Sequence, residues 1–196
     1  KKFNNTPFPK SKPVITLASR LLIEKGIWEY LDVAEYFNKK KYKITFNLVG
    51  DIDISNPSSL SKKDLIYLKK SKSINFLGFK KNIQNIFSKS HIIILPSYYG
   101  EGLPKVLIEA ASCGRPIITT NIPGCKDSII PNKTGILVEP KNFDQLKASI
   151  EKLVKDRNLC KKMGLNARLY AEKNFDIRSV VLKHLNIYRK LISAIL

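Results

Sequence analysis

The sequence predicts one α/β domain built on a doubly wound parallel sheet with helices on both faces. Short apolar runs rich in β-branched residues alternate with segments of helical periodicity from residue 13 to residue 155. One of these runs, HIIILPS (91–97), is apolar along most of its length, which is typical of a strand buried on both faces of a parallel sheet. We find no internal repeat and no low-complexity linker, so a single domain of 196 residues accounts for the pattern.

The first half of the chain contains four predicted strands and three predicted helices. The strands are 13–19, 43–50, 73–79 and 91–97. The helices run from about residue 25, from 60 to 70 and from 83 to 90. Each strand is a short apolar run, and each helix repeats apolar residues every three or four positions. The second helix should turn Leu65, Ile66 and Leu68 inward.

The second half begins with a helix whose ends the sequence marks clearly. Pro104 suits a first helical turn and Gly114 the position just past the end, so this helix should span about 104–113. Asn142 can cap a later helix, with Gln145 reaching back to it. The other predicted elements are strands 116–120 and 134–140, a short helix near 125–130, and helices at 157–173 and 177–194.

The three cysteines and the apolar runs bound the class of protein. Cys113, Cys125 and Cys160 form no C-x-x-C pair and leave an odd count, which disfavours a disulfide framework or a zinc site and fits a reducing compartment. No apolar run approaches the ~20 residues that span a bilayer. The first residues, KKFNNTPFPKSKP, also lack the apolar core of a secretory signal. We therefore expect a cytoplasmic protein.

The formal net charge of +19 raises the question of a polyanionic partner. The excess is spread along the chain, and the 35 basic side chains are mostly lysine, whereas nucleic-acid readers favour arginine for bidentate contacts. We therefore favour a generally lysine-rich surface over a dedicated polyanion site and expect no nucleic-acid partner. Peripheral contact with an anionic membrane, at the inner face of the plasma membrane, is compatible with this charge.

The segment SYYGEGLPKVLIEAASCG (97–114) carries the chemistry that the sequence reveals. It connects a buried strand to a helix, and Gly102 and the amides of 102–106 form an anion site at the start of that helix. Glu101 and Glu109 would be repelled by phosphate, but carboxylates accept hydrogen bonds from hydroxyl groups. An anion between two hydroxyl-binding acids describes a nucleotide sugar. Alternatively, Glu101 favours the helix dipole and Glu109 pairs with Lys105.

The same segment resembles the donor-binding region of retaining glycosyltransferases of the GT-B fold, family 4 type. The resemblance extends along PSYYGEGLPKVLIEAASCGRPIITTNIPGC, and ASRLLIEKG (18–26) looks like the family motif GRL-xx-EKG. FLGF (76–79), TGILVEP (134–140) and MGLNAR…FD (163–176) follow in the family's order. This resemblance implies a Rossmann-like domain that forms the C-terminal half of a GT-B enzyme, with additional C-terminal helices.

The resemblance also implies a role for individual residues. Arg20 and Lys25 would hold the donor diphosphate, Glu101 would contact the transferred sugar, and Glu109 would bind the ribose hydroxyls. Amides around Gly102, Leu103 and Pro104 would add phosphate contacts, although Pro104 itself has no N–H. Phe79 and Lys80 would lie in the base-binding loop. Ser19 stands where the family often has glycine, which departs from the motif.

The family has no essential metal or other cofactor, so none is expected here. Asp51 and Asp53 follow a strand and resemble a Mg²⁺-binding pair, but solvated turn carboxylates are the favoured interpretation. His91 and His184 are interpreted as structural. Arg115 follows a helix end, where a cation is electrostatically favourable without any function.

The family's enzymes have two similar domains, and this chain resembles only the second. We expect residues 1–12 to be a linker remnant, 13–175 to bind the nucleotide sugar, and the helix 176–196 to pack on the absent N-terminal domain, which carries the acceptor site. The expected function is transfer of a hexosyl or N-acetylhexosaminyl residue from a UDP-sugar to a polysaccharide or lipid-linked acceptor, with this half inactive alone. The alternative is a non-catalytic module that binds a nucleotide sugar or a nucleic acid.

Overall fold

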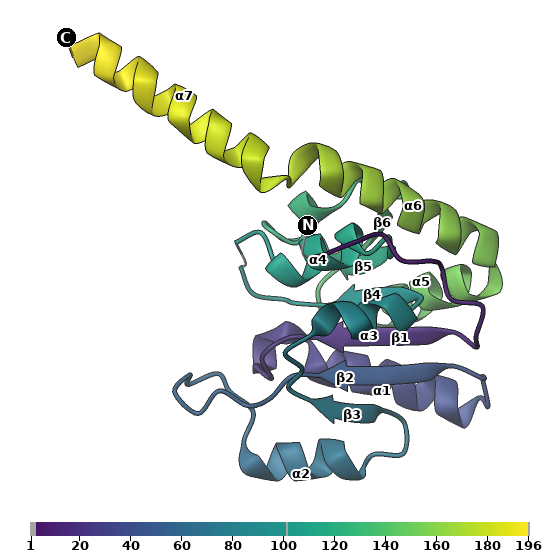
Figure 1. Cartoon of the computed structure of the whole chain (residues 1–196). Coiled ribbons are helices and arrows are strands. Elements are labelled where there is room, and N and C mark those ends of the chain that lie inside the picture. The colour runs from purple at the N-terminus through teal and green to yellow at the C-terminus, as the bar shows by residue number, and fades with distance from the viewer. Residues whose placement is uncertain (1–2, 101, 196) are drawn as a thin grey trace.

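The computed structural model describes residues 3–100 and 102–195. Its centre is a six-stranded sheet, parallel throughout, in the order β3-β2-β1-β4-β5-β6 (Figure 1). The strands are β1 (Val14–Ala18), β2 (Thr45–Val49), β3 (Asn75–Gly78), β4 (Ile92–Leu95), β5 (Ile117–Thr120) and β6 (Gly135–Val138). This is the doubly wound parallel sheet that the sequence predicts, with every strand at its predicted place.

Helices cover both faces of the sheet (Figure 1). They are α1 (Ile27–Lys39), α2 (Lys62–Lys70), α3 (Ile83–Lys89), α4 (Lys105–Ser112), α5 (Phe143–Lys155), α6 (Arg157–Asn174) and α7 (Ile177–Ile195). Two short 3₁₀ turns, η1 (Ile23–Lys25) and η2 (Lys126–Ser128), complete the set. The helix predicted from residue 25 therefore starts two residues later, after the separate turn η1.

The core is split by the sheet into two clusters, as the alternation of side chains along a strand requires. In β4, Ile92 and Ile94 face the cluster under α1 and α5, while Ile93 and Leu95 face the cluster under α3 and α4. All four are buried. The continuous apolar run thus has the two-sided burial that its composition predicts.

Some predicted details are wrong at helix surfaces. Ile66 of α2 is 53% exposed, because this short helix buries Leu68 fully and Leu65 only in part. Asn142 caps α5 as predicted by accepting from the Gln145 N–H at 2.9 Å. The Gln145 side chain, however, accepts from the Glu139 N–H at 2.7 Å instead of reaching back to Asn142.

Residues 3–12, which we call the N-terminal segment, have no regular secondary structure and lie along the body of the domain (Figure 1). Arg115 holds this segment and is 1% exposed. Its guanidinium donates to Thr6 O at 3.2 Å, Thr6 Oγ1 at 2.6 Å and Pro7 O at 3.0 Å, and its other donors reach the carbonyls of Phe87, Ser88 and Gly114. The sequence predicted only that Arg115 is electrostatically favourable at a helix end. In the structure, Arg115 is a buried side chain that joins the N-terminal segment to the body of the domain. The domain limits at 12/13 and 175/176 stay predictions.

The last helix contrasts with the rest of the domain. α7 extends away from the body (Figure 1). Its large apolar side chains are exposed. These are Ile177, Val181, Leu182, Leu185, Ile187, Tyr188, Leu191 and Ile192. Among the described residues, no helix combines the length and apolarity needed to cross a membrane.

Candidate functional site

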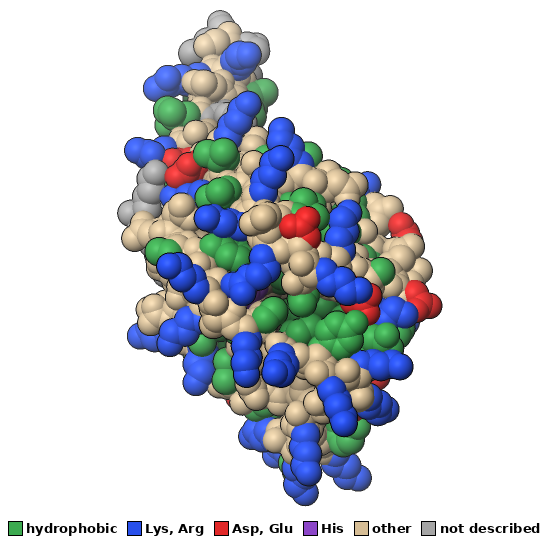
Figure 2. Space-filling model, turned by 90° about the vertical axis from the view of Figure 1, so that its right-hand side faces the viewer, with side chains coloured by type: hydrophobic (Ala, Val, Ile, Leu, Met, Phe, Trp, Pro, Cys, Tyr) green, Lys and Arg blue, Asp and Glu red, His purple; other side chains and the backbone are tan. Residues whose placement is uncertain are grey.

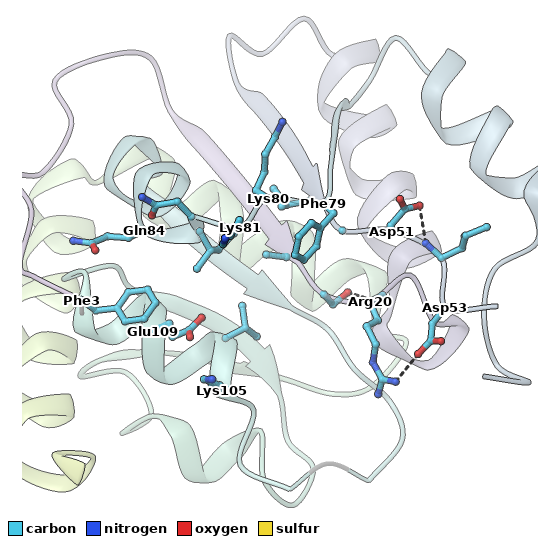
Figure 3. A pocket seen from close by; sticks show the side chains of 18 of the residues that line it. Phe3, Arg20, Asp51, Asp53, Phe79, Lys80, Lys81, Gln84, Lys105 and Glu109 are labelled. Atoms are coloured by element: carbon cyan, nitrogen blue, oxygen red, sulfur yellow. Dashed lines mark hydrogen bonds and ion pairs between the residues drawn. The ribbon is translucent and has the colours of Figure 1, made fainter. Parts of the chain in front are cut away.

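A cleft of about 1360 Å³ opens at the carboxyl edge of the sheet, where β1, β2 and β3 end. Doubly wound sheets bind ligands at this edge, beside the point where the strand order reverses, here between β1 and β4. Figure 3 shows side chains that five separate parts of the chain bring to the cleft. The lining residues are Phe3, Ala18, Ser19, Arg20, Val49, Gly50, Asp51, Ile52, Asp53, Ile54, Phe79, Lys80, Lys81, Asn82, Ile83, Gln84, Lys105, Val106 and Glu109.

Arg20 lies at one end of the cleft, just after β1. Its Nη1 donates to Asp53 Oδ2 at 2.8 Å (Figure 3). The Ser55 hydroxyl donates to the other carboxylate oxygen at 2.7 Å. The Ser55 hydrogen bond and then Arg20 lower the pKa of Asp53, so the carboxylate stays charged. Arginine has five donors, so this pairing leaves others available for an anion.

Glu109 and Lys105 come from α4 on the other side of the cleft (Figure 3). Pro104 is the N-cap residue of α4, and the helix buries Leu107, Ala110 and Ala111 against the sheet. Because residues four apart share one helix face, Lys105 and Glu109 both line the cleft. Glu109 is half-buried. One face of a single helix thus presents a cation near its first turn and an acid one turn later.

Phe79 and Lys80 line the cleft from the loop that follows β3. The Phe79 ring is 73% exposed and projects into the opening (Figure 3). An aromatic ring exposed at the opening of a cleft is available to contact a ligand. The structure therefore brings four predicted residues, Arg20, Phe79, Lys80 and Glu109, to one cleft. The roles assigned to them stay predictions.

Lys25 ends the turn η1 and stands next to the loop that leads into α4. Gly26, at φ 72°, allows this approach, since a Cβ there would lie 2.4 Å from Pro96 O. The Tyr98 N–H donates to Glu24 O at 3.0 Å and joins the turn to the loop. Lys141 lies 4.1 Å from the centre of the Tyr98 ring, and burial raises the pKa of that phenol. Lys25 therefore sits beside the loop, outside the lining of the cleft.

The remaining predicted residues belong to that loop. Gly102 and Leu103 are exposed, and Pro104 is buried at the start of α4. None of the three is among the lining residues of the cleft. The amide groups of the first turn of α4 nevertheless point toward the same edge of the sheet, as the free N–H groups of a helix start must. Glu101 lies outside the described residues.

The sequence analysis did not predict that Phe3, Gln84 and Lys105 line the cleft. The i, i+4 spacing of Lys105 and Glu109 would have found the lysine. Gln84 follows the predicted base loop by a few residues. Phe3 had no signal at all, since its position depends on how the N-terminal segment packs.

No cluster of three or more metal-ligating side chains occurs in residues 3–100 and 102–195. Asp53, predicted as a solvated turn carboxylate, is hydrogen-bonded to Arg20 and Ser55.

The three cysteines are free and buried. Burial raises the pKa of Cys113 to about 11 and that of Cys160 to about 12, which keeps both thiols protonated and unreactive.

Lysine and arginine side chains are scattered over the face that Figure 2 shows, interspersed with apolar and uncharged polar groups. A nucleic-acid groove would gather them in a stripe along one surface. On this face, the charge is therefore distributed as the sequence predicts.

Known proteins resemble this chain in sequence. A model of the family described as glycosyl transferases group 1 matches residues 1–170. The N,N'-diacetylbacillosaminyl-diphospho-undecaprenol alpha-1,3-N-acetylgalactosaminyltransferase of Campylobacter jejuni is 30% identical over 181 residues, which are 92% of this chain and 46% of that protein. The UDP-Gal:alpha-D-GlcNAc-diphosphoundecaprenol alpha-1,3-galactosyltransferase of Escherichia coli is 29% identical over 178 residues, 89% of this chain and 45% of that protein.

The fold is shared as well. Sucrose-phosphate synthase from Thermosynechococcus elongatus superposes with a TM-score of 0.84 at 25% identity, covering 98% of this chain and 50% of that one. This chain thus spans about half the length of the curated relatives and the solved structure that it matches. The family match over residues 1–170 and the shared fold lead to one conclusion: the chain belongs to the glycosyl transferases group 1 family.

Proposed function

We propose that this chain is the donor-binding half of a retaining glycosyltransferase whose donor is a UDP-sugar. The observation that carries the proposal is a single cleft at the carboxyl edge of the sheet with Arg20 at one end and Glu109 on α4 opposite. A diphosphate needs cations and helix-start amides, and a ribose needs an acceptor such as a carboxylate. The name of the Escherichia coli relative includes UDP-Gal, which supports uracil as the base of the donor here.

The diphosphate would lie between Arg20, Lys25 and the first turn of α4. As the glycosidic bond to the sugar breaks, negative charge accumulates on the departing nucleoside diphosphate. Fixed donors aimed at that charge lower the barrier, by roughly 3 kcal/mol for each donor. The chain's own part in the reaction is thus electrostatic, and no protein nucleophile and no metal is proposed. An acceptor hydroxyl that arrives on the face of the departing group retains the anomeric configuration.

The two ends of the donor would be held by different side chains. Glu109 accepts hydrogen bonds from the ribose hydroxyls, and the loop with Phe79 and Lys80 borders the uracil. Glu101, which lies outside the described residues, would contact the transferred hexosyl or N-acetylhexosaminyl group.

The second half of the enzyme would supply the acceptor site. The relatives are about twice as long as this chain, and their names give diphospho-undecaprenol acceptors, which supports a polysaccharide or lipid-linked acceptor here. The exposed apolar face of α7 would pack on that second domain. The net charge of +19 would favour peripheral contact with an anionic membrane where such acceptors reside.

Titration of this chain with UDP by calorimetry tests the proposal. UDP should bind, and Glu109→Gln should weaken binding by roughly ten- to a hundredfold, because hydrogen bonds to a charged acceptor are lost. The matched control is Glu151→Gln in α5, which removes a carboxylate outside the cleft and should leave the affinity unchanged. Sugar transfer should appear only when the other half of the enzyme is present.

Three results would overturn the proposal. They are no binding of UDP, GDP or ADP, equal binding by the Glu109 variant, or tight and steeply salt-dependent binding of DNA or RNA without a response to UDP. The last result would favour the nucleic-acid module instead.

A further inference from the structure

Phe3, the first described residue of the N-terminal segment, lies in the cleft at the carboxyl edge of the sheet. Phe3 is one of the residues that line it, together with Gln84 of α3 and Glu109 of α4. Figure 3 shows the Phe3 ring beside the Glu109 carboxylate, with Gln84 above it. The ring is partly buried and packs on the same core cluster as Ile83 and Val106, which also line the cleft. At this end of the cleft, an apolar surface therefore lies beside the Glu109 carboxylate and the Gln84 amide.

Three arginines hold the segment that brings Phe3 there. Arg168 donates to Phe3 O at 3.1 Å, Arg115 to Thr6 and Pro7, and Arg157 to Pro9 O at 3.0 Å. The chain has only six arginines among its 35 basic residues, so half of them bind this segment. Arginine suits the task because its planar fork reaches several carbonyl oxygens at once.

The path of the segment is also sterically defined. Asn5 crosses the end of α4 over Gly114, where a Cβ would lie 2.6 Å from Asn5 Oδ1. The Thr6 hydroxyl donates to Cys113 O at 3.4 Å. Arg168 joins Phe3 O to the carbonyl of Ser112, which belongs to the last turn of α4. The segment is thus anchored to the same helix that carries Glu109, and this fixes the ring relative to the acid.

We propose that Phe3 contacts the nucleoside of the donor, and that Arg115 and Arg168 are positioning residues that hold it there. This inference rests on the proposed function, because Glu109 marks the ribose position. An aromatic ring offers a π-face to a base and an apolar surface to the ribose carbons, and stacking of this kind tolerates any base. Phe3 would therefore strengthen binding of the nucleoside without choosing uracil over other bases.

Calorimetry on the whole chain tests the contact, with UDP and inorganic pyrophosphate as probes. Phe3→Ala should weaken UDP binding roughly tenfold, while Phe3→Tyr, which keeps the ring, should stay within about twofold of the wild type. Pyrophosphate binding should not change in either variant. The matched control is Phe143→Ala, which removes a partly exposed ring on α5, outside the cleft.

Unchanged UDP affinity in Phe3→Ala would overturn the contact. An equal loss for UDP and pyrophosphate would do so too, because it would show a general collapse of the cleft. If the wild-type chain does not bind UDP, the proposed function fails first. The two failures are therefore distinguishable.

The positioning role needs a variant that folds, because Arg115 is fully buried. Thr6→Val keeps the shape of the side chain and removes the hydroxyl to which Arg115 Nη2 donates at 2.6 Å. It should weaken UDP binding about threefold and leave pyrophosphate binding unchanged, and Thr6→Ser should restore the affinity. Wild-type UDP affinity in Thr6→Val would show that this anchor does not act on the nucleotide.

Discussion

Arg20 and Arg115 are the same type of residue in opposite surroundings, since Arg20 is exposed and Arg115 is buried. Arg115 is 1% exposed and is held by carbonyl oxygens and one hydroxyl from three parts of the chain. The side chain of Arg20 is 60% exposed and pairs with Asp53 at the edge of the cleft. A buried guanidinium must have its donors satisfied by the fold, whereas an exposed one can exchange a partner for a ligand. The region around Arg115 is therefore expected to govern stability, and the region around Arg20 to govern binding.

Replacement of Arg115 should give the largest effect. Arg115→Met leaves the buried carbonyls of Phe87 and Ser88 and the N-terminal segment without their donor, so the free energy of unfolding should fall by about 3–5 kcal/mol. Arg20→Met should leave that free energy nearly unchanged and abolish most UDP binding. Urea unfolding followed by circular dichroism measures the first quantity and calorimetry the second. Similar losses of stability in both variants would contradict the expectation that Arg115 governs stability and Arg20 governs binding.

His91 makes the stability of the Arg115 region depend on pH. Its Nδ1 accepts from the Val14 N–H at 3.1 Å, its ring meets Phe8 edge-on, and burial lowers its pKa from 6.5 to about 4. A depressed pKa means that the folded protein keeps the ring neutral while the unfolded chain protonates it. The contribution is complete above pH 6.5 and is lost as the pH falls toward 4, by up to about 3 kcal/mol.

His91→Asn tests this dependence. The Asn Oδ1 can still accept from the Val14 N–H but does not titrate, so stability between pH 4 and 6.5 should become much flatter than in the wild type. The matched control is His184→Asn on α7, whose exposed ring should leave the profile as it is. Urea unfolding at several pH values is the measurement. An unaltered profile in the His91 variant would show that other groups cause the loss.

Asp53→Asn should have the smallest effect, and on binding alone. An exposed ion pair adds little to stability, so unfolding should not change. Removing a carboxylate beside Arg20 reduces repulsion of the diphosphate, and UDP binding should tighten about threefold. Asp64→Asn, at the cap of α2 outside the cleft, should not change the affinity. Weaker UDP binding in the Asp53 variant would show instead that the carboxylate holds Arg20 in place.

The two regions also differ in how well the sequence predicts them. Arg20 and Glu109 belong to or adjoin regular elements: Arg20 lies two residues after β1, and Glu109 lies within α4. Their relative place follows from the rule that the carboxyl ends of parallel strands meet at one edge. Arg115 also follows a helix, but its role depends on residues more than a hundred positions away in the chain. No local pattern reports that the N-terminal segment passes above it.

The strands, the helices and the edge of the sheet at which the cleft opens were determined by the sequence alone, because periodicity, helix ends and buried apolar runs are local properties that survive into the fold. The packing of the N-terminal segment, the burial of Arg115 and His91, the pairing of Arg20 with Asp53 and the arrival of Phe3 beside Glu109 were decided only by the tertiary structure. Each of these depends on which surfaces meet across long distances in the chain, and on how far water is excluded where they meet.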